Sequence, residues 1–167
     1  MSDLITLMQA PVAAPSRPRP PAPPFAELVS TSNFSFLHGG SHPEELVNAA
    51  AHLGLNGFGL TDRNSFAGVV RGYVAARDME PAPPGFRYLV GVRLCFADGT
   101  PDIIAYPSTR LAYGRLCKLL TIGNQRGEKG KPVLYLSDLF GAGHPGSTTE
   151  QGPTENHAQG QLFILVP

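Results

Sequence analysis

The sequence predicts an α/β protein, because strand-like and helix-like segments alternate along the chain. Short apolar runs that end at Gly, Ser or Asp are followed by segments whose apolar residues recur at helical spacing. The predicted order is β-α-β-α-β-β-α, then a loop and a last strand. The 19 glycines and 17 prolines mark the turns between these elements. Such alternation favours a parallel sheet with right-handed crossovers.

Two strand–helix units are predicted in the first half of the chain. Residues 25–30 are expected to form a strand, and Ser41 is expected to open a capping box for a helix that ends at Gly54. Residues 57–62 have the composition of a short buried strand that ends in a polar residue. Residues 64–77 are expected to form a second helix. The apolar positions of that helix are Phe66, Val69, Val70, Tyr73 and Val74.

The second half is predicted to contain a pair of strands, a long helix and a final strand. Residues 87–97 have the composition of a strong strand, and residues 102–106 return as its neighbour after a turn. A helix is expected over residues 107–124. Residues 133–140 are predicted as a short strand and a helical turn capped at its start, and residues 161–166 as the last strand. The apolar stripe of the long helix consists of Leu111, Leu116, Leu119 and Leu120.

The chain is expected to divide into a leader and one folded region. Residues 1–24 carry seven prolines between Pro11 and Pro24, and such a stretch is predicted to be disordered. A start codon upstream of the true N-terminus and a proline-rich ligand segment are the alternatives. Residues 25–167 form the folded region, in which residues 141–160 are expected to be a loop or disordered. About three strand–helix units precede an uncovered last strand, whereas a closed (β/α) barrel takes about 250 residues, so a fragment is expected.

The composition excludes several classes of protein. Thirteen basic and 13 acidic residues give a formal net charge of zero, so bulk charge does not predict nucleic-acid binding. No apolar run reaches the roughly 18 residues of a membrane span, and no secretory signal opens the chain. Two cysteines are too few for a disulfide framework or a cysteine zinc site. A reducing, cytoplasmic setting is therefore expected.

Polar residues at the carboxyl ends of the predicted strands are the candidate functional groups, since ligands bind there in α/β folds. Asp62 ends a buried strand and precedes a helix, so it either caps that helix or pairs with Arg63 or Arg93. A metal site can be drawn from His38 and Asp62, but it is short of ligands. The five histidines show neither His-x-His nor His-x3-His spacing.

Three other features have both a structural and a functional interpretation. Cys95 lies in a predicted strand and Cys117 on a helix stripe, which indicates core packing and not nucleophilic catalysis. Residues 38–45 place two glycines before a helix start and could hold an anion, although no P-loop lysine follows. Residues 125–131 are basic and glycine-rich, and they either form a solvated loop or touch nucleic acid.

Two long, contiguous segments carry a family resemblance. The first is STSNFSFLHGGSHPEELVNAAAHLGLNGFGLTDRNSFAGVVR, residues 30–71, and the second is YLVGVRLCFADGTPDIIAYPSTRLAYGRLCKLLTIGNQRGEKGKPVLYLSDLF, residues 88–140. Both resemble the PHP (polymerase and histidinol phosphatase) domain of bacterial error-prone DNA polymerases of the alpha-subunit, C-family type. The likeness runs from about Phe25 to Phe140. It implies a distorted (β/α)7 barrel, of which this chain would supply about the first half.

The resemblance maps the metal ligands of the family onto this sequence. Active PHP domains hold two or three metal ions, zinc or manganese, and hydrolyse phosphoesters. The five ligand positions are Val29, Thr31, His38, Arg63 and Arg93. Of these, only His38 could bind a metal, and the two arginines add fixed positive charge where cations would lie. We therefore expect a degenerate site with no cofactor and no catalytic residue, in which the arginines pair with Asp62 or a nearby carboxylate.

For function, the resemblance implies a structural domain at the N-terminus of an error-prone DNA polymerase. Such polymerases are nucleotidyltransferases that use Mg²⁺ and copy damaged templates by translesion synthesis, and their polymerase carboxylates lie far downstream. This chain is expected to be inactive alone, to brace the rest of the polymerase chain, and to reach DNA and other translesion subunits through it. The alternatives are a metal-dependent phosphoesterase that uses His38 and Asp62, and a stand-alone interaction module.

Overall fold

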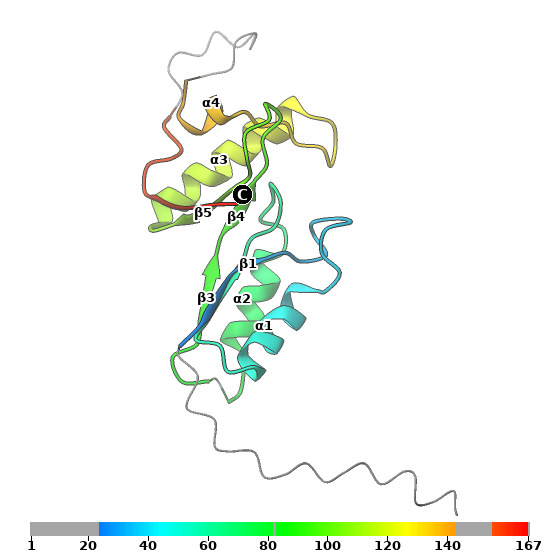
Figure 1. Ribbon diagram of the computed structural model, residues 1–167, viewed down its shortest axis with the longest axis vertical. Coiled ribbons are helices and arrows are strands. Elements are labelled where there is room, and N and C mark those ends of the chain that lie inside the picture. Colours follow the sequence, from blue (N-terminus) through cyan, green and yellow to red (C-terminus); the bar gives the residue numbers. More distant parts are fainter. Residues whose placement is uncertain (1–23, 82, 143–154, 167) are drawn as a thin grey trace, which may run out of the picture.

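Two three-stranded sheets lie end to end along the long axis of the molecule (Figure 1). The computed structural model describes residues 24–81, 83–142 and 155–166. The elements are β1 (Ala26–Ser30), α1 (Pro43–His52), β2 (Gly57–Leu60), α2 (Val69–Arg77), β3 (Arg87–Val90), β4 (Val92–Leu94), β5 (Ile103–Pro107), α3 (Arg110–Arg126), α4 (Leu136–Leu139) and β6 (Gln161–Leu165). The mixed α/β architecture predicted from the sequence is confirmed.

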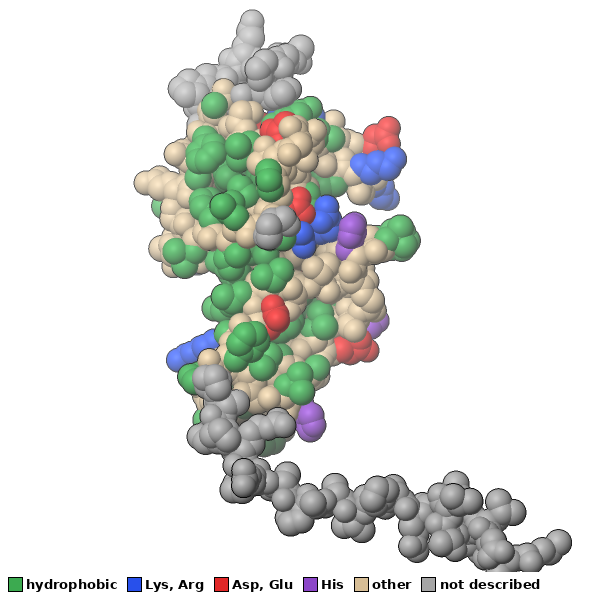
Figure 2. Space-filling model, in the orientation of Figure 1, with side chains coloured by type: hydrophobic (Ala, Val, Ile, Leu, Met, Phe, Trp, Pro, Cys, Tyr) green, Lys and Arg blue, Asp and Glu red, His purple; other side chains and the backbone are tan. Residues whose placement is uncertain are grey.

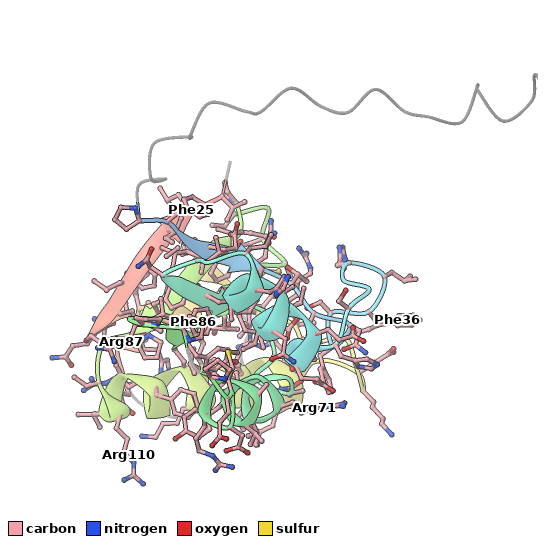
Figure 3. All side chains as sticks on the ribbon, turned by 90° about the horizontal axis from the view of Figure 1, so that it is seen from below. Phe25, Phe36, Arg71, Phe86, Arg87 and Arg110 are labelled. Carbon is pink, nitrogen blue, oxygen red and sulfur yellow. The ribbon has the colours of Figure 1, made fainter. Side chains whose placement is uncertain are left out.

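The first sheet is parallel, as predicted, with the strand order β1-β2-β3. Helices α1 and α2 pack side by side, as Figure 3 shows from below, and both contribute to one core with β2. Phe58 and Leu60 of β2 and Val47 of α1 are buried there. Burying each such side chain contributes about 1.5–3 kcal/mol, so this core holds the first sheet against its two helices.

The second sheet is antiparallel, with the strand order β4-β5-β6. The β4–β5 pair is the strand pair expected around the turn, whereas a second sheet separate from the parallel one was not predicted. The connection between β4 and β5 is a short turn with Gly99 at φ 81°, and this turn leaves no room for a crossover helix. Helix α3 packs on this sheet through the buried side chains of Leu116 and Leu119. The turn after residue 97 was correctly predicted from Asp98-Gly99.

The strand predicted over residues 87–97 is broken at Gly91 into β3 and β4, which belong to different sheets. A Cβ atom at Gly91 would lie 2.6 Å from the ring of Tyr106. The Tyr106 hydroxyl donates a hydrogen bond to the Leu28 carbonyl oxygen at 2.6 Å, so this β5 side chain reaches back to β1. Burial raises the pKa of Tyr106 well above its ordinary value, which keeps the hydroxyl protonated as a donor. The ring thus joins the two sheets where the strand breaks.

Two helices begin later than the sequence predicts. The residue that caps α1 is His42 and not Ser41; its N–H donates to the Glu45 carboxylate at 2.9 Å. Helix α2 begins only at Val69, and its predicted apolar face is right only in part. Phe66 packs against a core and Val69 is half-buried, whereas the other three predicted positions are exposed. The one fully buried residue of α2 is Gly72.

Three predicted apolar positions of α2 are exposed because the helix approaches β3 closely through its opposite side. A Cβ atom at Gly72 would lie 2.5 Å from the Tyr88 hydroxyl oxygen, and that hydroxyl donates to the Val69 carbonyl oxygen at 3.2 Å. Ala75 and Ala76 therefore face the core. The larger side chains point to solvent: Val70, Tyr73 and Val74.

The remaining differences lie in the second half. Thr109 caps α3, because its hydroxyl accepts from the Ala112 N–H at 3.1 Å. Leu111, which was predicted as part of the apolar stripe, is exposed instead. The short strand predicted at the start of residues 133–140 does not form, since α4 is the next element after α3. The last strand, β6, was predicted, and it pairs with β5. Most of the predicted leader and of the 141–160 loop lies outside the described residues, so the proposed domain limits and the incomplete barrel stay predictions.

Candidate functional site

The parallel ladder continues beyond the first sheet and brings the candidate polar residues together. After β2, the Arg93 N–H donates to the Asp62 carbonyl oxygen at 3.0 Å, and the Asn64 N–H donates to the Arg93 carbonyl oxygen at 2.9 Å. Arg63 and Arg93 therefore lie side by side in a parallel bridge. The segment that follows the carboxyl end of β2 and the start of β4 thus meet at the junction of the two sheets.

Asp62 is buried, with 2% of its surface exposed, and its carboxylate is satisfied by two serines. Oδ1 accepts from the Ser32 N–H at 2.8 Å and from the Ser35 hydroxyl at 2.7 Å, and Oδ2 accepts from the Ser32 hydroxyl at 2.8 Å. Ser35 Oγ in turn accepts from the Arg63 N–H at 2.9 Å. A buried carboxylate requires such donors, since its desolvation would otherwise be very costly. The network fastens the loop after β1 to the end of β2.

This geometry corrects two expectations for Asp62. It does not cap α2, whose N-terminal cap position is Gly68. It makes no ion pair with Arg63 or Arg93 among the described residues. The serines that replace these partners were not among the predicted candidates, because their role depends on the path of the loop after β1.

The carboxylate that pairs with both arginines is Asp102, the residue before β5. Its Oδ2 atom accepts from Arg63 Nη1 at 2.9 Å and from Arg93 Nε at 2.8 Å. The side chains of Arg63 and Arg93 remain 31% and 23% exposed. Burial by itself would raise the pKa of the Asp102 carboxyl, but the hydrogen bond from Arg93 and the charge of Arg63 outweigh it and lower that pKa. We call Arg63, Arg93 and Asp102 the arginine clamp.

The sequence expectation of a carboxylate near the arginines is thus met by a residue that it did not name. A signal for it was present in the predicted pair of strands. Arg93 pairs with Ile104, so Asp102 lies two residues from its partner, as a diagonal neighbour on the same face of the sheet. Deriving that register from the turn would have identified Asp102.

Of the other positions aligned with metal ligands, only His38 has a side chain that binds metals well. Val29 on β1 is 44% exposed, Thr31 follows the strand, and His38 is exposed on the loop. No group of three or more His, Cys, Asp or Glu side chains that could hold a metal ion occurs among the described residues. Because valine and arginine cannot ligate, these residues do not fit the zinc or manganese that the family resemblance implies. The arginine clamp instead carries one excess positive charge, which suits an anion.

Cys95 adjoins the clamp without the properties of a nucleophile. Asn64, at φ 45°, binds the Cys95 backbone twice: its amide donates to the carbonyl oxygen at 3.0 Å and accepts from the N–H at 2.9 Å. Burial raises the pKa of the Cys95 thiol to about 11, although the Arg63 charge opposes this. The thiol is therefore protonated near neutral pH and unreactive.

The fold and this strand-end site define the class of protein. The PHP domain model matches residues 27–144, so the chain belongs to the PHP domain family. Within that family the chain is similar to error-prone DNA polymerases. It is 53% identical to the error-prone DNA polymerase of Rhodopseudomonas palustris (strain BisB5) over 147 residues, which are 87% of this chain. It is 45% identical to the error-prone DNA polymerase of Caulobacter vibrioides over 149 residues, which are 89% of this chain. The predicted resemblance is confirmed.

The chain spans only 12% of the length of each of these two relatives. Among solved structures it is similar to an amidohydrolase from Chromobacterium violaceum, with a TM-score of 0.48 and 24% identity over 60% of this chain and 33% of that one.

None of the helices that the structure describes is both long and apolar enough to cross a membrane.

Proposed function

We propose that this chain is a non-catalytic PHP-like domain of an error-prone DNA polymerase, and that it braces the polymerase body. The observation that carries the proposal is the arginine clamp. Where the family pattern has metal ligands, Arg63 and Arg93 are tied to Asp102 at 2.9 and 2.8 Å. Fixed guanidinium charges repel metal ions, so the strand ends serve as a structural tie between the two sheets.

An exposed apolar stripe on α2 supports the bracing role. Val70, Tyr73 and Val74 lie at i, i+3 and i+4, and Val70 is 69% exposed. Figure 2 shows further hydrophobic side chains over both halves of the molecule. Stripes of this kind mark interaction surfaces, and the relatives carry a long chain beyond the matched region that can cover it.

The activity of the parent protein belongs to the same proposal. In it, the polymerase residues and their Mg²⁺ lie outside this chain, which reaches DNA and any translesion subunits through the rest of the polymerase. The setting is the cytoplasm, and the process is translesion synthesis in DNA repair and replication. This domain supplies stability and placement, not chemistry.

A chimeric polymerase tests the bracing role. This chain would replace the matched 147 residues of the Rhodopseudomonas palustris BisB5 polymerase. We expect the chimera to extend a primer past an abasic site. Tyr73→Asp should reduce that activity several-fold, because a charge enters the apolar stripe, without changing the melting of the isolated chain.

The matched control is Asn48→Asp, which adds the same charge at an exposed position of α1. It should leave the chimera as active as the parent chimera. Equal activity of the Tyr73→Asp and Asn48→Asp chimeras would refute the role of the stripe. Hydrolysis of p-nitrophenyl phosphate by the isolated chain with added Zn²⁺ or Mn²⁺ would favour the phosphoesterase alternative instead.

A further inference from the structure

A pocket of about 400 Å³ opens beside the arginine clamp, where the two halves of the molecule meet. Its walls come from the loop after β1, the segment between β2 and α2, helix α3 and the loop after α3. The residues that matter for its chemistry are Phe34, Arg63, Ser65, Phe66, Asn124 and Gly130. The volume lies within the range of about 300–1,000 Å³ that is usual for small-molecule sites.

The charge of the pocket favours an anion. Arg63 uses one of its nitrogens, Nη1, to bind Asp102, and its other guanidinium N–H groups have no protein partner among the described residues. The two guanidinium groups of the clamp face a single carboxylate, which leaves one net positive charge. The pKa of the Asp102 carboxyl is lowered, so Asp102 is ionised at neutral pH. Its negative charge holds Arg63 in place. A guanidinium with free N–H groups is suited to bind phosphate.

The loop after α3 adds further positive charge at the rim. Lys129 and Lys131 are exposed on either side of Gly130, which lines the pocket. Lys131 lies 3.5 Å from Glu128, a weak exposed pair. The base of this loop is fixed, because Arg126 binds the Asp138 carboxylate at 2.6 and 2.9 Å. Figure 2 shows two groups of Lys and Arg side chains near each other on the right-hand side of the molecule.

An aromatic wall completes the pocket. The Phe34 side chain is 39% exposed. Its backbone N–H donates to the Ser32 hydroxyl oxygen at 3.2 Å, so the loop that carries the ring is anchored. Phe66 also lines the pocket, and it packs on Tyr113 with ring centroids 4.9 Å apart. Asn124 at the rim is exposed. An aromatic face next to cationic groups is the combination that binds the base and the phosphate of a nucleotide.

We infer that this pocket binds one nucleotide unit, with its phosphate at Arg63 and its base against Phe34. The unit is either a free nucleotide or part of a single-stranded DNA. The sequence left open whether residues 125–131 form a solvated loop or touch nucleic acid. The second interpretation is supported here, because Gly130 of this loop and Arg63 line the same pocket. This inference goes beyond the bracing role and does not depend on it.

Binding measurements on the 167-residue chain at low salt test the inference. Fluorescence anisotropy with a labelled dT12 oligonucleotide and calorimetry with dTMP are the two arms. Phe34→Leu should weaken binding about tenfold through lost stacking, and Lys129→Ala should weaken it several-fold. If both ligands bind and respond to Phe34→Leu, the pocket accepts free nucleotides; if only dT12 does, its ligand is single-stranded DNA.

Two control variants distinguish binding in the pocket from nonspecific electrostatic or hydrophobic binding. Phe36, two residues from Phe34, is 82% exposed and points outward from the loop in Figure 3, so Phe36→Leu should leave binding unchanged. Lys118→Ala removes a lysine of α3 that pairs with Glu155 and does not line the pocket, and it should also have no effect. Absence of binding by both ligands would overturn the inference. So would equal losses for Phe34→Leu and Phe36→Leu.

Discussion

Replacing Asp62 by asparagine should destabilise the protein by about 2–4 kcal/mol. Three donors converge on the buried carboxylate, at 2.7, 2.8 and 2.8 Å. The amide oxygen of asparagine can keep one or two of them, whereas its NH2 group cannot accept. A serine hydroxyl that faces the NH2 group must turn to accept from it, so hydrogen bonds to a charged group are lost. Each hydrogen bond to a charged group contributes about 1.5–3 kcal/mol, and one to two are lost. Total stabilities are only about 5–15 kcal/mol, so the effect is large.

Urea unfolding followed by far-UV circular dichroism and tyrosine fluorescence measures this change. The matched control is Asp78→Asn, which removes an exposed carboxylate paired only with its neighbour Arg77 and should leave the midpoint unchanged. The Ser35→Ala variant and the Asp62→Asn/Ser35→Ala double variant complete a cycle. A coupling energy near 1 kcal/mol or more is expected between them. An Asp62→Asn midpoint equal to that of Asp78→Asn would refute the reasoning.

Three further predictions follow from individual contacts. Gly91→Ala places a Cβ atom 2.6 Å from the Tyr106 ring and should destabilise the fold by about 1–3 kcal/mol. Gly114→Ala, in open space on α3, should stabilise it by about 0.5–1 kcal/mol. Equal melting temperatures of the two variants would contradict both expectations. Burial lowers the pKa of His157, so stability should be full above the ordinary histidine pKa of about 6.5 and fall as the pH drops below it, and His157→Gln should remove that slope between pH 7 and 5. Cys95, whose pKa is raised to about 11, should react with iodoacetamide far more slowly than a free thiol at pH 7.5; a rate equal to that of glutathione would show that the thiol is accessible and ionised.

The alternation of strands and helices was predictable because it rests on local periodicity and turn residues. It placed Asp62 and Arg63 directly after the second strand, and the structure brings Arg63 beside Arg93 of β4. The partners of these residues were not predictable in the same way. Ser32 and Ser35 reach Asp62 across about 30 residues of sequence, and only the path of the loop after β1 brings them there.

Two errors in the fold have a common physical cause, the close approach of aromatic side chains to glycine. Periodicity favoured the larger residues of α2 as its buried face, yet Gly72 lets the helix approach Tyr88 and turns those residues to solvent. Apolar continuity favoured one strand through Gly91, yet the Tyr106 ring occupies the space beside that glycine and the strand breaks. A sequence pattern shows which residues are apolar but not which small residue permits contact.

In the proposed function, the arginine clamp stands where a PHP domain would hold its metal ions. Inductively coupled plasma mass spectrometry of the purified chain, dialysed after exposure to Zn²⁺ and then to Mn²⁺, measures whether it holds any. We expect far less than one ion per chain and no rise in melting temperature with either metal. One or more ions retained per chain, lost on His38→Ala, would contradict this expectation.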